Sequence, residues 1–189
     1  YKYKQGDIVF IFLGRMSKAK GIFSLLEVFL KLSAKYNNIK LLLVGPEEAG
    51  SKSLIIDFVN KNDINNLVIL IDNTLEPHKY LNVSDVLCLP SEREGFGSVV
   101  IEAGAMKIPT IGSRIYGLTD SIVDGHTGLL FEKNNNFDFY NKMELLINSP
   151  NLRIKLGLNA YKFVNSHFKS SFVSSELESF YIKNVIIEK

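Results

Sequence analysis

Residues 7–21, DIVFIFLGRMSKAKG, decide the fold class of this chain. The apolar run from Asp7 to Gly14 predicts a strand that is buried on both faces, as strands of a parallel sheet are. Between Gly21 and Tyr36 apolar residues recur at helical spacing, which predicts an amphipathic helix directly after that strand. A buried strand followed by such a helix is the repeating unit of α/β proteins with a parallel sheet.

The same alternation continues along the chain. Further strands are expected at 39–44, 67–71, 86–89, 109–112 and 128–131, and helices at 51–62, 77–83 and 98–106, with two or three more in 137–189. The sequence therefore predicts a single α/β, Rossmann-like domain: a parallel sheet flanked by helices, with a helical C-terminal tail. Ligands of such sheets bind beyond the carboxyl ends of the strands, so function is expected in the loops beginning at Gly14, Gly45, Asp72, Pro90 and Ser113.

Composition narrows the possible functions. The 189 residues carry 22 Lys and Arg against 20 Asp and Glu, a formal charge of +2, which gives no reason to expect a nucleic-acid partner or a membrane surface. The only cysteine, Cys88, lies in an apolar run, which excludes a disulfide framework and a multi-cysteine zinc site. The three histidines show no spacing suited to zinc. The chain begins at Tyr1 rather than Met, which suggests a fragment of a longer protein.

The loop after the first strand carries two cations close to a helix start. Gly14 and Arg15 follow the strand, and Lys20 and Gly21 stand where the helix begins. Cations beside a helix N-terminus form an anion site, because free backbone N–H groups and the helix dipole reinforce the side chains. A solvated basic loop with Lys18 and Lys20 simply exposed is an equally good interpretation of the spacing alone.

The loop after the fourth strand, SEREGFGS at 91–98, predicts a second anion-binding turn. Two glycines around Phe96 allow the backbone to approach a ligand closely. The following helix is expected to start with Ser98 as its N-cap, and exposed amides from Phe96 to Val99 would suit a phosphate group.

Two carboxylates bracket this turn. Glu94 precedes the amides, and Glu102 follows about one turn inside the helix. Taken singly, Glu94 could be a surface loop charge and Glu102 a first-turn glutamate favoured by the helix dipole. Together they favour a ligand with both phosphate and hydroxyl groups, because carboxylates accept hydrogen bonds from sugars.

These residues resemble the signature of retaining glycosyltransferases of the GT-B fold, family 4. The resemblance runs from about 7 to 131 and rests on several motifs in order. They are Gly14-Arg15 with Lys20-Gly21, Pro90-Ser91, Glu94-Gly95-Phe96-Gly97, Glu102-Ala103, Pro109-Thr110-Ile111, Gly117-Leu118-Thr119-Asp120 and Asp124-Gly125-His126-Thr127-Gly128. Glu94 and Glu102 match the E-x7-E motif of that family. Two positions depart from its pattern: Asp120 stands in place of Glu, and Lys107 stands where Gly is preferred, so that lysine is expected to bear the steric cost of a left-handed backbone.

The resemblance implies that residues 1–189 are the C-terminal, nucleotide-sugar-binding half of a GT-B enzyme whose N-terminal acceptor domain is absent. It implies that Arg15 and Lys20 bind the diphosphate, that Glu94 contacts the donor sugar and that Glu102 holds ribose hydroxyls. Arg15, Lys20 and Glu94 are the expected catalytic residues. The remaining binding residues expected are Gly14, Gly95, Phe96, Gly97 and Ser98 around the phosphates, with Asn73 and Leu75 near the base.

The implied activity is retaining transfer of a sugar from a nucleoside-diphosphate donor, with a UDP-sugar favoured, to a glycan or lipid-linked acceptor. The expected setting is cell-surface polysaccharide biosynthesis in the cytoplasm, with peripheral association of the whole enzyme at the inner face of the membrane left open. No cofactor and no metal are expected, and the isolated domain is expected to be inactive.

Two other functional classes are weighed against this one. A non-catalytic nucleotide-binding or regulatory Rossmann-like module would keep the fold without the reaction. A dehydrogenase of the NAD type is disfavoured, because the first strand leads into Gly14-Arg15-Met16-Ser17 rather than Gly-x-Gly-x-x-Gly.

The apolar residues of the C-terminal tail leave two interpretations open. They are Phe172, Leu177, Phe180, Tyr181, Ile186 and Ile187. The tail either forms a surface for the missing domain or caps the sheet of this one.

Overall fold

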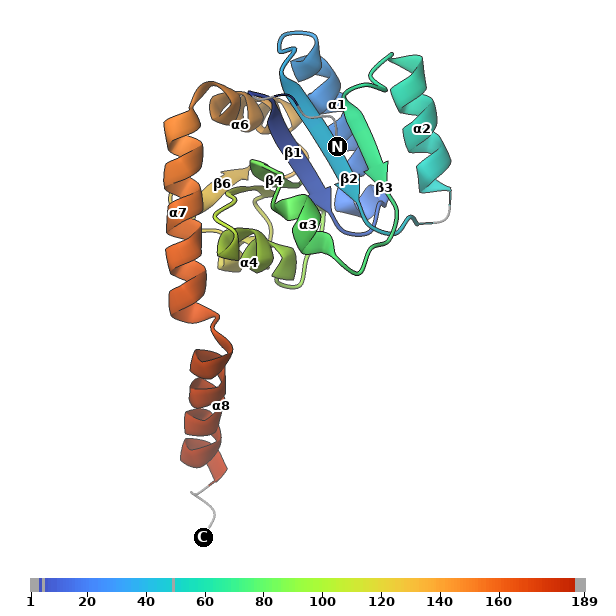
Figure 1. Cartoon of the computed structure of the whole chain (residues 1–189). Helices are drawn as coiled ribbons and strands as arrows, with labels where there is room; N and C mark the ends of the chain where they lie inside the picture. Colours follow the sequence, from blue (N-terminus) through green and yellow to red (C-terminus); the bar gives the residue numbers. More distant parts are fainter. Residues whose placement is uncertain (1–3, 5, 49, 186–189) are drawn as a thin grey trace.

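A six-stranded parallel sheet forms the centre of the molecule (Figure 1). The computed structural model describes residues 4, 6–48 and 50–185. The strands are β1 (Ile8–Leu13), β2 (Ile39–Val44), β3 (Val68–Ile71), β4 (Val86–Leu89), β5 (Thr110–Ser113) and β6 (Gly128–Phe131). They pair in the order β3-β2-β1-β4-β5-β6, so the α/β, Rossmann-like fold predicted from the sequence is confirmed.

Helices cover both faces of the sheet. They are α1 (Ile22–Ser33), α2 (Ser51–Lys61), α3 (Pro77–Leu81), α4 (Ser98–Ala105), α5 (Leu118–Ser121), α6 (Asn136–Asn148), α7 (Pro150–His167) and α8 (Ser170–Val185), with a short 3-10 helix, η1 (Lys18–Lys20), before α1. Helices α1, α2 and α6 pack on one face, and α3, α4 and α5 pack on the other.

The central strand shows why both faces must be covered. Side chains alternate across a strand, so Phe10 and Phe12 enter the core under α1, while Val9 and Ile11 enter the core under α4. All four are buried. A strand that is apolar on both sides has no face to offer to water, and this places β1 in the middle of the sheet.

The C-terminal helices leave the sheet. Helix α7 runs beside α4, where Gly104 lets Val164 and Ala160 approach closely, and α8 continues beyond α7 away from the sheet (Figure 1). The interpretation that the tail caps this sheet is therefore wrong for the described part of α8, where Leu177 and Tyr181 are exposed. Ile186 and Ile187 lie outside the described residues, as does the side chain of Phe172. No described helix combines the length and apolar character that crossing a membrane requires.

One departure from the family pattern has a visible backbone consequence. Lys107 follows the end of α4 with a φ of 63°, in the left-handed region, as the sequence predicts. Its N–H donates to the carbonyl of Gly104, and the N–H of Ile108 donates to Ala103. These bonds close the end of the helix at the steric cost that a non-glycine residue bears there.

Candidate functional site

The strand order creates a crevice between β1 and β4. The chain leaves β1 toward α1 on one face of the sheet and leaves β4 toward α4 on the other face. The two loops therefore separate above the carboxyl ends of neighbouring strands, which is where open α/β sheets bind ligands.

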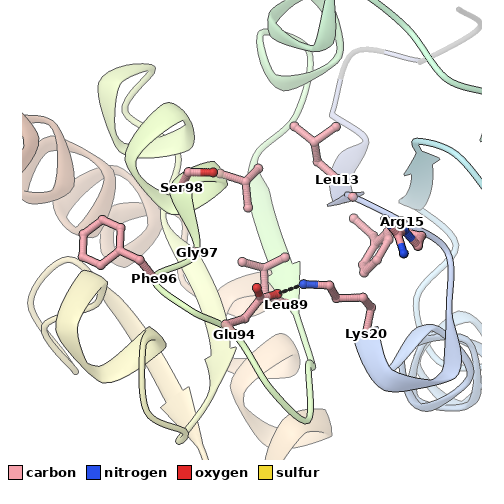
Figure 2. A pocket seen from close by; sticks show the side chains of 11 residues that line it. Leu13, Arg15, Lys20, Leu89, Glu94, Phe96, Gly97 and Ser98 are labelled. Atoms are coloured by element: carbon pink, nitrogen blue, oxygen red, sulfur yellow. Dashed lines mark hydrogen bonds and ion pairs between the residues drawn. The ribbon is translucent and has the colours of Figure 1, made fainter.

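A cavity of about 360 Å³ occupies this crevice (Figure 2). Its walls include residues from both loops that the sequence places in the site. They are Gly14, Arg15, Lys20, Glu94, Phe96, Gly97 and Ser98. The cations of the first loop and the acidic and glycine-rich parts of the second thus meet at one place, although more than 70 residues separate them in the sequence.

An ion pair joins the two loops across the cavity. Lys20 Nζ lies 2.7 Å from Glu94 Oε1 (Figure 2). Ser91 Oγ donates a second hydrogen bond to the same oxygen over 2.9 Å. The Glu94 side chain is only 12% exposed, against 32% for Lys20. Glu94 is therefore a positioned carboxylate rather than a solvated loop charge.

Gly21 brings the loops into this contact. A Cβ at Gly21 would lie 2.0 Å from the carbonyl oxygen of Pro90, so the close approach of the two backbones requires glycine. Its φ of 72° is also in the left-handed region. A backbone hydrogen bond from Glu92 to Ala19, 2.9 Å long, closes the same contact.

The start of α4 differs from the sequence prediction. Ser98 was expected as the N-cap, but the structure places Gly97 there and makes Ser98 the first helical residue. Gly97 has a φ of 70°, and a Cβ on it would lie 2.7 Å from Leu118, so a serine does not fit that position. No side chain caps the helix, and the Val100 N–H donates to the Gly97 carbonyl. The N–H groups of Ser98 and Val99 and the helix dipole are therefore available to an anion in the cavity.

A second cavity, of about 230 Å³, adjoins the first and shares Leu13, Gly14 and Val99 with it. Asn73 and Glu102 line it, as the sequence suggests. Partial burial raises the pKa of Glu102 above its ordinary value of 4.5, because desolvation disfavours the charged carboxylate.

Two other wall residues of the second cavity were expected from the sequence only through the loops that carry them. Pro46 and Thr74 contribute to it from the loops after β2 and β3. The available signal was positional, because both loops follow strands next to β1 in the predicted sheet.

Some predicted residues lie outside both cavities. Leu75 is 96% exposed and lines neither of them. Gly95 also lines neither, and its carbonyl packs against Gly117, where a Cβ would lie 2.6 Å away. Asp120 is exposed on α5. Cys88 is fully buried, and burial raises the pKa of its thiol.

The described residues contain no group of three or more His, Cys, Asp or Glu side chains that could hold a metal ion. The cationic groups at the first cavity are Arg15 and Lys20. The Arg15 side chain is exposed and makes no hydrogen bond or ion pair with the described part of the chain, so it can turn to a ligand.

The chain matches known proteins in sequence. The family model described as glycosyl transferases group 1 matches residues 2–163. Over 181 residues the chain is 35% identical to the capsular polysaccharide biosynthesis glycosyltransferase CapM of Staphylococcus aureus, covering 96% of this chain and 47% of that protein. The chain thus spans about half the length of this curated relative.

Solved structures match it in fold. A mutant of S. aureus TarM in complex with Fondaparinux, alpha-GlcNAc-glycerol and UDP is 27% identical, with a TM-score of 0.83 over 94% of this chain and 36% of that one. The C-terminal domain of the group 1 glycosyl transferase LpcC from Francisella tularensis is 24% identical, with a TM-score of 0.80 over 87% of this chain and 88% of that one. The second likeness shows the fold alone.

Proposed function

Because this chain belongs to the glycosyl transferases group 1 family, we propose that it binds the nucleoside-diphosphate sugar donor of a glycosyltransferase. One observation carries the proposal: Arg15, Lys20, Glu94 and the uncapped start of α4 surround a single cavity at the switch point of the sheet. A UDP-sugar is the favoured donor, since the similar TarM structure contains UDP.

The diphosphate fits the basic side of the first cavity. Arg15 and Lys20 supply positive charge, and the free N–H groups at the start of α4 supply hydrogen-bond donors. The backbone around Phe96 and Gly97 lies at the same wall, where no side chain caps the helix. Two cations and a helix N-terminus together favour a doubly charged ligand over a neutral one.

The sugar and the nucleoside fit the two acidic positions. Glu94 faces the first cavity and would accept hydrogen bonds from hydroxyls of the donor sugar. Glu102 lines the adjoining cavity, which suits the ribose, and Asn73, which lines the same cavity, would lie near the base. Leu75, with its exposed side chain, can take part only through its backbone.

The proposed reaction is sugar transfer with retention at the anomeric carbon. As the bond from that carbon to the diphosphate breaks, negative charge grows on the leaving nucleoside diphosphate. Arg15, Lys20 and the α4 dipole lie where they stabilise this charge electrostatically. Protein groups alone supply this stabilisation, so the proposal requires no metal.

The rest of the enzyme would bring the acceptor. We place the acceptor-binding N-terminal domain in the part of the relatives that this chain does not span. The name of the S. aureus relative supports a role in capsular or related polysaccharide synthesis. We propose a glycan or lipid-linked acceptor for this role, at the cytoplasmic side of the membrane. The chain alone should then bind donor weakly and transfer nothing.

Titration of the ¹⁵N-labelled chain with UDP, GDP and ADP tests the proposal. We expect at least one of them to shift backbone amide resonances at Gly14 and at 96–99 with millimolar affinity or better. Absence of binding by all three at millimolar concentration would contradict it. A merely nucleotide-binding module would instead bind, but Glu94→Ala would leave the transfer rate of the full-length enzyme unchanged.

A further inference from the structure

Ser91 has an unusual environment for a loop residue. It directly follows Pro90 at the end of β4, and its side chain is completely buried. Its Oγ donates to Glu94 Oε1 over 2.9 Å. A buried hydroxyl is costly unless it is paired, so this bond fixes the rotamers of both side chains.

The hydrogen bond from Lys20 to Glu94 Oε1 is broken more easily than the one from Ser91. Lys20 Nζ donates to Glu94 Oε1 over 2.7 Å, but Lys20 is a long, flexible and partly exposed side chain. Under the proposed function a bound diphosphate attracts Lys20. Ser91 carries no charge and lies in the interior, so its bond to Glu94 remains when Lys20 turns to the phosphates.

The other oxygen of the Glu94 carboxylate, Oε2, is not held in the same way. Within the described residues no hydrogen bond reaches Glu94 Oε2. Because Oε1 already accepts two hydrogen bonds, Oε2 is the carboxylate oxygen left to accept from a ligand in the cavity that Glu94 lines.

We propose that Ser91 is a positioning residue, which holds Glu94 by Oε1 so that Oε2 meets a hydroxyl of the donor sugar. The inference rests on the proposed function and deepens it. The loop contacts support it, because the packing of Pro90 on Gly21 and the bond from Glu92 to Ala19 fix the backbone that carries Ser91.

A double-mutant cycle on this chain tests the role. Affinities for UDP and for UDP-glucose are measured by NMR titration for the wild type, Ser91→Ala, Glu94→Gln and the double variant. Ser91→Ala should weaken UDP-glucose binding about tenfold, the loss expected for one hydrogen bond to a charged group. It should change UDP affinity less than twofold, and it should add nothing in the Glu94→Gln background.

Three further variants exclude a general effect on stability. Ser91→Thr keeps the hydroxyl and should restore UDP-glucose binding, whereas Ser91→Cys keeps most of the volume without a strong donor and should not. Ser84→Ala removes a hydroxyl bonded to the carbonyl of Tyr80, just before the amino end of β4 and so at the opposite end of the strand from the cavity, and should leave both affinities unchanged.

The outcomes separate this inference from the proposed function. Equal loss of UDP and UDP-glucose affinity, or additive losses in the cycle, would show that Ser91 only stabilises the loop. A wild-type chain that binds neither UDP nor UDP-glucose would overturn the UDP-sugar part of the proposed function, and the role of Ser91 with it. A wild-type chain that binds both, beside an unaffected Ser91→Ala variant, would overturn this inference alone.

Discussion

Lys20 and Lys18 belong to the same 3-10 helix, yet only Lys20 lines the first cavity and pairs with Glu94. Lys20→Met should weaken UDP binding about 10- to 100-fold, because it removes a charge from the diphosphate and leaves Glu94 to repel it. Isothermal titration calorimetry or NMR measures the effect. Lys18→Met is the matched control, and an equal loss in that variant would mean that only the net charge matters.

The raised pKa of Glu102 should make the stability of the folded chain depend on pH. Partial burial raises its pKa in the folded chain above the ordinary 4.5, so the folded state binds the proton more tightly than the unfolded state does. Its contribution to stability is therefore favourable at low pH and is lost as the pH rises through the raised pKa. Glu102→Gln should melt at the same temperature as the wild type near pH 3.5, and about 1–2 °C higher near pH 7.

Thermal melts of both proteins between pH 3.5 and 7.5 check this expectation. A variant that is less stable at neutral pH would mean that the ionised carboxylate has a favourable partner. Glu132→Gln is not a suitable control, because Glu132 pairs with Arg114. Glu48→Gln is suitable, because Glu48 is exposed in the loop after β2 and its side chain makes no ion pair among the described residues.

For single residues, the sequence predicts which side chains share a cavity more reliably than it predicts which hydrogen bonds they form. Arg15, Lys20 and Glu94 could be assigned to one cavity because each follows a strand at the switch point. The bond from Ser91 to Glu94 could not, because it depends on a hydroxyl that becomes buried only in the folded chain. Leu75 shows a related limit: the loop that carries it follows β3 as expected, but the outward direction of its exposed side chain could not be predicted from the sequence.

Gly21 ends η1 and packs against Pro90 in the loop after β4. Gly21→Ala places a Cβ 2.0 Å from the Pro90 carbonyl and adds a side chain at a φ of 72°. We expect a loss of about 2–4 kcal/mol in the free energy of unfolding, combining left-handed strain with the displaced contact. Because Lys20 and Glu94 then move apart, UDP affinity should fall as well.

Gly50→Ala provides a matched control at another helix start. Gly50 has a φ of 80°, and a Cβ there would meet nothing within 4 Å. Its substitution should therefore cost only the backbone strain, about 1–2 kcal/mol, and should not affect UDP binding. Chemical denaturation and NMR titration of both variants distinguish the effect of backbone strain from that of the disturbed Pro90 contact. Equal losses of stability and of UDP affinity in Gly21→Ala and Gly50→Ala would show that the Pro90 contact is unimportant.

Elements differ in how well the sequence predicts them. The six strands lie within a residue or so of their expected positions, because all but β5 are short runs rich in apolar residues. The elements η1 and α5 were not expected, since three or four residues show no periodicity. Their existence depends on tertiary contacts, such as those of Gly21 with Pro90 and Gly117 with the Glu94 carbonyl.

At the scale of the whole molecule, α8 extends away from the body of the domain (Figure 1). Several of its apolar side chains are exposed. Leu177 is 50% exposed and Ile182 is 52% exposed. Replacing both by serine should change the melting temperature and the UDP affinity of this chain very little, because these side chains already contact water. Differential scanning calorimetry and NMR titration measure the two quantities.

In the full-length enzyme the same double variant should behave differently. We expect the exposed apolar side chains of α8 to pack on the acceptor-binding half, where each buried aliphatic side chain contributes up to about 2 kcal/mol. Leu177→Ser with Ile182→Ser should then destabilise the closed enzyme and lower its transfer rate, while Glu178→Ser, on the same helix, should not. If the double variant instead lowered the melting temperature of this chain by several degrees, α8 would rest on its own domain in solution. An unaffected full-length enzyme would mean that Leu177 and Ile182 do not pack on the acceptor-binding half. The expected contact between α8 and that half would then be wrong.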